Sequence, residues 1–78
     1  MILNVLIVNP DSVIFEGTVQ YLLVPTITGT AGLMPSHTPL FTELIKGDIT
    51  LVGEKEEIVA IEGGILRIKE DSVTILTN

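Results

Sequence analysis

The sequence has no cysteine and only one histidine among its 78 residues. Disulfide bonds are therefore excluded, and a metal site would have to be built from other ligands. A chain this short buries only about 60–65% of the surface that its unfolded form exposes. Its stability must therefore come from apolar packing without covalent or metal support.

Basic residues are also scarce: four against ten acidic residues, for a net charge of −6. Nucleic acid and anionic lipid both attract basic surfaces, so direct binding to either is not expected. No apolar run approaches the roughly 20 residues of a membrane-spanning helix. Residues 1–4 carry neither a basic run nor a small-residue cleavage site, so we expect no transmembrane segment and no signal peptide.

Apolar residues, by contrast, are abundant: 46% of the chain is hydrophobic, with a mean hydropathy of +0.60. So small a domain has little interior in which to bury them. We therefore expect an exposed apolar patch, which usually marks a surface that binds a partner. The alternative is a dense core with scattered surface aliphatic side chains, as in any protein.

The pattern of residues predicts strands and no helix, because no window of about twelve residues carries a helical apolar stripe. Turn residues are expected at 9–12, at 53–56, at the Gly63-Gly64 pair, read as a two-residue hairpin turn, and at 70–71. We predict an all-β fold: a flattened β-sandwich or barrel of about eight to ten short strands, forming one domain over residues 1–78. The expected strands cover residues 3–8, 13–24, 33–34, 41–45, 49–52, 57–62, 65–69 and 73–76.

Within these strands, alternation predicts which side chains share a face. Three sets of side chains are each expected to share a face. The sets are Leu3, Val5 and Ile7; Val19, Tyr21 and Leu23; and Leu66 and Ile68, with Arg67 and Lys69 on the opposite face.

Residues that could carry chemistry are few. Ser36 and His37 adjoin each other without a nucleophile-elbow motif, so His37 is interpreted as a loop residue that bonds locally or touches a partner. The glycines at 29 and 32 lack the lysine and helix of a phosphate-binding loop. The acidic residues 54, 56 and 57 around Lys55 indicate a solvated turn that also discourages edge pairing. We expect no catalytic residue, metal or cofactor.

Several motifs occur in an order typical of one family. They are IFEGTV at 14–19, a segment from Pro25 to Leu40 containing GLMP and H-x-P-L, IEGGILRI at 61–68, and VTIL at 73–76. Together they cover nearly the whole chain, which resembles the epsilon subunit of F-type ATP synthases.

The resemblance implies a non-catalytic subunit of the central stalk that binds the gamma subunit and the c-ring, and so couples proton flow to ATP synthesis. It implies a location on the catalytic-head side of an energy-coupling membrane: the cytoplasmic face of the bacterial inner membrane, or the matrix or stroma of an organelle. In the family, a C-terminal helical hairpin follows the sandwich and can inhibit hydrolysis or bind ATP. The sequence ends where that sandwich would end, so we expect neither the inhibitory arm nor nucleotide binding.

The resemblance also assigns two contact segments. One faces the c-ring loops, and many relatives carry an acidic residue between its two glycines; here neutral hydrogen bonding through threonines or backbone groups would have to serve. The gamma-facing residues are Pro35, His37, Thr38, Pro39 and Thr42; the c-ring-facing residues are Thr28, Gly29, Thr30, Ala31 and Gly32.

Two other classes remain open. A ligand-binding barrel would need a cavity between the sheets, which tight packing of Phe15, Tyr21, Leu66 and Ile75 would contradict. A small hydrolase would need a carboxylate within hydrogen-bonding reach of His37.

Overall fold

The computed structural model describes residues 1–36 and 38–78. In this part of the chain the regular structure is entirely β, which confirms the predicted fold class. The strands are fewer and longer than the eight to ten expected: β1 Leu3–Val8, β2 Val13–Val19, β3 Tyr21–Thr26, β4 Gly29–Leu33, β5 Leu40–Val52, β6 Glu56–Lys69 and β7 Ser72–Thr77.

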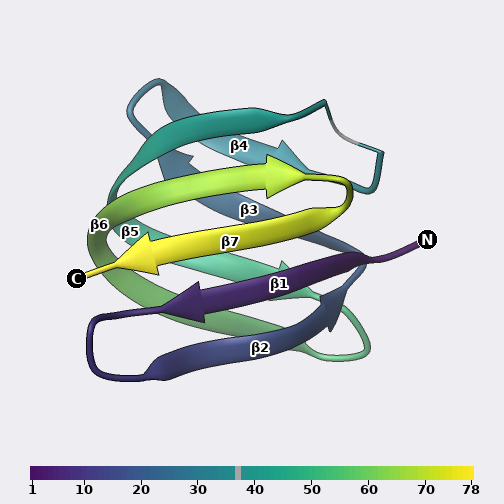
Figure 1. Ribbon diagram of the computed structural model, residues 1–78, viewed down its shortest axis with the longest axis horizontal. Coiled ribbons are helices and arrows are strands. Elements are labelled where there is room, and N and C mark those ends of the chain that lie inside the picture. The colour runs from purple at the N-terminus through teal and green to yellow at the C-terminus, as the bar shows by residue number, and fades with distance from the viewer. Residues whose placement is uncertain (37) are drawn as a thin grey trace.

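The strands form one hydrogen-bonded sheet in the order β2-β1-β7-β6-β5-β3-β4. β1 and β7 are parallel, and every other neighbouring pair is antiparallel. The long strands β5 and β6 bend, so the sheet folds over into two layers (Figure 1). The front layer contains β2, β1, β7, the second half of β6 and the first half of β5. The back layer contains β4, β3 and the other halves of β5 and β6.

The bend lies where a hairpin turn was expected. β6 continues through Gly63 and Gly64, so the predicted turn at this glycine pair is wrong. Their φ angles are +147° and +158°, and a Cβ on Gly64 would stand 2.3 Å from the carbonyl oxygen of Leu76 in β7. The Thr77 hydroxyl also donates to the Gly63 carbonyl at 2.6 Å. The two glycines therefore let β6 curve while β7 lies against it.

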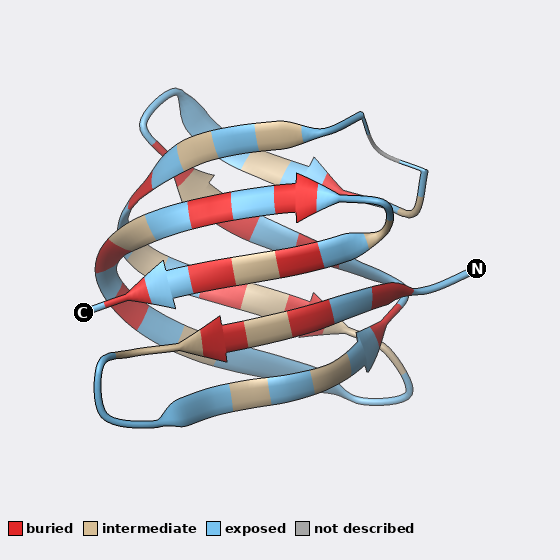
Figure 2. Ribbon diagram, viewed as in Figure 1, coloured by how far each residue is buried: buried red, intermediate tan, exposed pale blue. Residues whose placement is uncertain are grey.

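Buried residues alternate with exposed ones along strands of both layers (Figure 2), and the buried aliphatic side chains form one core cluster. The predicted shared faces of β1 and of the second half of β6 are confirmed, and both of these faces are buried. The face predicted for residues 19, 21 and 23 is wrong: Val19 is buried, but Tyr21 and Leu23 are exposed. Gln20 separates β2 from β3, and the alternation restarts there. The core comprises Leu3, Val5, Ile7, Val19, Leu22, Val24, Leu33, Leu44, Ile49, Leu51, Ile61, Leu66, Ile68, Val73 and Ile75.

The three other predicted turns are confirmed. Between β1 and β2, the Asn9 side-chain oxygen accepts the amides of Asp11 at 2.9 Å and Ser12 at 2.7 Å, as turn-forming Asn does. Residues 53–55 connect β5 to β6. Glu70 and Asp71 connect β6 to β7 with φ of +51° and +62°, the left-handed geometry that a two-residue hairpin turn requires.

Candidate protein-binding surfaces

The segment expected to face the c-ring is the tip of the β3–β4 hairpin. Thr28 lies in its turn, and β4 already begins at Gly29. The buried Thr26 hydroxyl holds the tip together: it donates to the Gly29 carbonyl at 2.5 Å and accepts the Thr28 amide at 3.2 Å. The side chains of Thr28 and Thr30 remain exposed. The hairpin therefore presents hydroxyl groups on an internally bonded turn.

Sequence reasoning missed one residue of this tip. Ile27 is 60% exposed although it is a large aliphatic side chain. Its position between Thr26 and Thr28 could have predicted this exposure, because an aliphatic side chain in a two-residue turn has no core to enter. Of the other residues assigned here, Ala31 packs against the core and Gly32 is exposed.

The segment expected to face gamma connects β4 to β5, and Asp71 anchors its start. The Ser36 amide donates to the Asp71 carboxylate at 2.7 Å, while the Asp71 carbonyl accepts the Asn4 amide at 2.9 Å. Asp71 thus ties the connection to the β6–β7 turn and to the start of β1. Pro35 is half-buried on this connection, and Pro39 is exposed.

The other residues assigned to this contact lie differently from one another. His37 lies outside the described residues. Thr38 is exposed on the same connection. Thr42 is half-buried in β5 and pairs with the fully buried Leu66, so its side chain is on the core side of the sheet. Phe41, which was not assigned, points outward and is 71% exposed.

The outward side of the front layer, called the outer face below, carries a continuous row of apolar side chains. Val8 pairs with Val13 on one side and with Leu76 on the other, and Leu76 pairs with Ile65. Directly paired residues share a face, so these four side chains form one row across four strands. Three of them are 41–57% exposed, and Val8 is half-buried. The predicted exposed apolar surface is confirmed.

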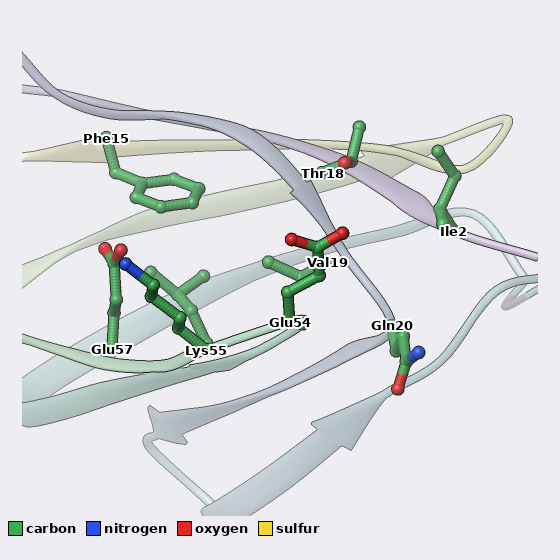
Figure 3. A pocket seen from close by; sticks show the side chains of 10 residues that line it. Ile2, Phe15, Thr18, Val19, Gln20, Glu54, Lys55 and Glu57 are labelled. Atoms are coloured by element: carbon green, nitrogen blue, oxygen red, sulfur yellow. The ribbon is translucent and has the colours of Figure 1, made fainter.

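A surface hollow of about 490 Å³ lies between β2 and the β5–β6 connection. Within the described residues, β2 and the first half of β6, which follows this connection, each have one unpaired edge, because β2 pairs only with β1 and the first half of β6 only with β5. Figure 3 shows Glu54 and Lys55 from the β5–β6 connection, and Glu57 from the start of β6, extending toward β2. Three of the ten lining residues are charged, and the other seven are apolar or neutral, so charged and apolar groups are mixed along the walls.

The core beneath this hollow bears on the ligand-barrel alternative. Leu66 and Ile75 are fully buried, and Phe15 packs against the same cluster. Tyr21 does not take part as expected, since it is 38% exposed. Tight packing of the interior therefore argues against a ligand cavity between the layers.

Over residues 1–36 and 38–78, no group of three or more His, Asp or Glu side chains is placed to hold a metal ion. No helix in that part of the chain is long and apolar enough to cross a membrane. The hydrolase alternative depends on the surroundings of His37, which lie outside the described residues.

A small two-layer β-sandwich with an internally bonded hairpin tip and an exposed apolar row has the surfaces of a protein-binding module. Residues 2–78 match the family described as "ATP synthase, Delta/Epsilon chain, beta-sandwich domain", and the chain belongs to this family. The match confirms the resemblance drawn from the motifs.

Curated relatives agree with this assignment. The ATP synthase epsilon chain of Leptospira interrogans is 36% identical over 97% of this chain, and that of Alkalihalophilus pseudofirmus is 39% identical over 95%. The matches cover 61% and 56% of those relatives, so the chain spans about three fifths of their length.

Solved structures share the fold. A chain of the Euglena gracilis mitochondrial ATP synthase superposes with a TM-score of 0.91 at 21% identity, covering 97% of this chain and 50% of that one. A chain from the Tetrahymena thermophila ATP synthase central stalk and c-ring gives 0.82 at 11% identity, with 96% and 62% covered. At such low identity these similarities concern the fold alone.

Proposed function

We propose that this chain is the β-sandwich of an epsilon subunit that binds the gamma subunit and the c-ring of an F-type ATP synthase. In this role it is a non-catalytic component of the central stalk and helps to couple proton flow to ATP synthesis. It lies on the catalytic-head side of the energy-coupling membrane. Family membership supports the proposal, as does the description of the Tetrahymena structure as central stalk and c-ring.

The observation that carries the proposal is the apolar row on the outer face. Full burial of a Leu or Ile side chain contributes about 1.5–3 kcal/mol, and these side chains are about half exposed, so each could contribute roughly half of that on contact. Phe41 adds a more exposed aromatic ring on the same face. A permanent partner would remove this apolar area from water, as in the core of a subunit interface.

The hairpin tip and the outer face serve different partners in this proposal. The tip lies at the β3–β4 turn of the back layer, away from β1 and β7 at the centre of the outer face (Figure 1). One rigid sandwich can therefore hold gamma on one surface while the tip meets the c-ring. Because Thr28 and Thr30 are neutral, the c-ring contact would use hydroxyl and backbone hydrogen bonds.

The gamma contact is tested with a matched pair of charged substitutions, Leu76→Glu on the outer face and Ile58→Glu on β6 in the back layer. The two residues are 52% and 62% exposed, so neither glutamate enters the core. We expect affinity for purified gamma from the same organism to fall more than about 10-fold for Leu76→Glu and less than about 2-fold for Ile58→Glu, because a charge at an interface core loses solvation without a partner. Equal binding by the two variants, both folded by circular dichroism, would place gamma elsewhere.

The c-ring contact is tested by cross-linking, for which the absence of native cysteine is an advantage. Thr30→Cys and Ile58→Cys each give a single-cysteine chain that is assembled into the whole synthase and treated with a short photoactivated cross-linker. We expect a cross-link to a c subunit from position 30 and not from position 58. The reverse pattern, or none from position 30, would contradict the assignment of the tip.

A further inference from the structure

Two of the four basic residues stand together on the outer face. Arg67 and Lys69 alternate with the buried Leu66 and Ile68 along β6, so both side chains point outward from the front layer. The chain as a whole carries a net charge of −6. A pair of cations at the end of β6, on one face, therefore stands out against an acidic molecule.

The surroundings of these cations combine apolar and polar groups. Arg67 pairs with Phe41 on one side and with Thr74 on the other, and Lys69 pairs with Ser72. Two shallow hollows of about 360 and 370 Å³ border them. Residues 70, 72 and 74 line the first hollow with the two cations, and residues 39–41 and 68 line the second.

In the part of the chain that the structure describes, neither cation forms an ion pair with a carboxylate. Within the described residues, the ion pair that forms joins Lys46 to Glu62 at 3.9 Å, at the bend of the long strands. Glu70 lines the first hollow together with the two cations, and the exposed Glu43 pairs with Ile65 on the same face. The Asp71 carboxylate accepts the Ser36 amide. The Arg67 guanidinium therefore faces outward beside an exposed aromatic ring.

We propose that Arg67, with Lys69 beside it, is the charged anchor of the outer face and receives a carboxylate of the gamma subunit. The inference rests on the proposed function, because it names the chemistry of that same contact. A guanidinium binds a carboxylate through two parallel hydrogen bonds, which fixes the orientation of a partner as well as attracting it. Arginine beside an aromatic residue is also a common composition for the energetic centre of an interface.

The net charge explains why the contact would be selective. An acidic partner surface is repelled by the net charge of −6 and attracted locally at Arg67 and Lys69. The apolar row provides contact area but does not orient the partner. The cation pair fixes the direction in which the partner lies across the row. Gamma should accordingly carry an Asp or Glu next to the apolar side chains that cover residues 65 and 76.

The test measures affinity for purified gamma, at low and at moderate salt, for three substitutions. Arg67→Glu should weaken binding at least about 30-fold at low salt, and the loss should shrink as salt rises, because charge pairs are screened. Arg67→Lys should weaken it about 3- to 10-fold, because the charge stays but the paired donors are lost. Lys46→Glu makes the same change in net charge away from this face and should weaken binding less than about 2-fold.

A reciprocal experiment identifies the partner group. Single Asp→Arg or Glu→Arg substitutions across the gamma contact surface are screened against the Arg67→Glu chain. We expect one of them to restore binding to within about 3-fold of the native pair, because it re-forms the ion pair with the charges exchanged.

The outcomes separate this inference from the proposed function. If the native chain does not bind gamma, the proposed function itself fails. If Leu76→Glu abolishes binding while Arg67→Glu binds like Lys46→Glu, the contact stands and the charged anchor is wrong. Binding of Arg67→Glu to gamma at native strength, together with Arg67-dependent binding of the native chain to phosphatidylglycerol vesicles, would assign the cations to lipid and overturn the inference.

Discussion

Gly64 offers the sharpest test of how the sheet folds over. A Cβ added at this position would lie 2.3 Å from the Leu76 carbonyl oxygen and 3.2 Å from the Thr77 Cα, both of them backbone atoms of β7. Ordinary contact begins near 3.4 Å, so Gly64→Ala requires a displacement of 3.4 − 2.3 = 1.1 Å along the line to the carbonyl oxygen. No flexible side chain can absorb it, and the hydrogen bonds between β6 and β7 must distort.

The expected loss of stability follows from these contacts. Overpacking of this kind costs about 1–3 kcal/mol, and weakening one or two strand hydrogen bonds adds about 0.5–1.5 kcal/mol each. Restricting the unfolded chain by replacing glycine offsets about 0.4–1 kcal/mol. The net loss is about 2–4 kcal/mol, a large part of the roughly 4–12 kcal/mol that a domain of this length has in total.

Thermal melting followed by far-ultraviolet circular dichroism measures this loss. Since 1 kcal/mol corresponds to about 4–8 °C in a domain of this size, Gly64→Ala should lower the midpoint by about 10 °C or more. Gly32→Ala is the matched control: its Cβ would meet only Leu23 Cδ2 at 3.5 Å, and its backbone is not left-handed. The control should melt within about 3 °C of the native chain. If Gly64→Ala also melts within about 3 °C of the native chain, the close approach of β7 does not determine the bend.

Three further predictions concern single residues. Asp71→Gly should speed hydrogen exchange of the Ser36 amide about 10-fold, because the amide loses its acceptor. Asp71→Asn keeps an acceptor and should change the exchange rate less. Equal exchange rates in the two variants would show that Asp71 does not anchor this connection. Thr26→Val should lower the free energy of unfolding by about 1–2 kcal/mol in urea, because the Gly29 carbonyl and Thr28 amide lose their partner, and Thr26→Ser should restore most of it. Leu66→Ala, at a fully buried site, should lower it by about 3–5 kcal/mol, and a loss below 1 kcal/mol would mean that the core can collapse around the gap.

Local alternation was enough to predict much of the fold. In β1, Leu3, Val5 and Ile7 share a face as predicted, because the alternation of side chains depends only on the strand itself, and that face is buried. The same holds for Leu66 and Ile68 against their charged neighbours. Turns with a local mechanism, such as the one bonded by the Asn9 side chain, were predicted for the same reason.

The glycine pair shows where local reasoning stops. Gly63-Gly64 fits a two-residue turn as well as it fits a bend, since both need unusual backbone angles or close approach. The pairing of β5 with β6 decides between a turn and a bend. It runs in one register, from Leu40 with Ile68 to Val52 with Glu56. The pairing of β5 with β6 extends far beyond the two glycines and keeps both strands continuous. The predicted number of strands was therefore too high.

The candidate sites were harder to predict than the fold, because their geometry is assembled from distant residues. The bond from Ser36 to Asp71 spans 35 positions. The apolar row depends on the parallel pairing of β1 with β7, from opposite ends of the chain. No periodicity records such a pairing, so composition predicted an exposed apolar surface without its location, and Phe41 went unassigned.

The bend and the proposed gamma contact are physically connected through one residue. The carbonyl group that approaches Gly64 belongs to Leu76, whose side chain is part of the apolar row, and the next residue of β6, Ile65, is its partner in that row. A shift of β7 caused by Gly64→Ala therefore moves two of the four side chains that gamma would cover. Binding should then weaken even at temperatures where the variant is fully folded, whereas Leu66→Ala, on the core side of the same strand, should reduce stability with less effect on binding by the folded fraction. Glycine at position 64 thus serves both the folding of the sheet and the alignment of Ile65 and Leu76 in the apolar row.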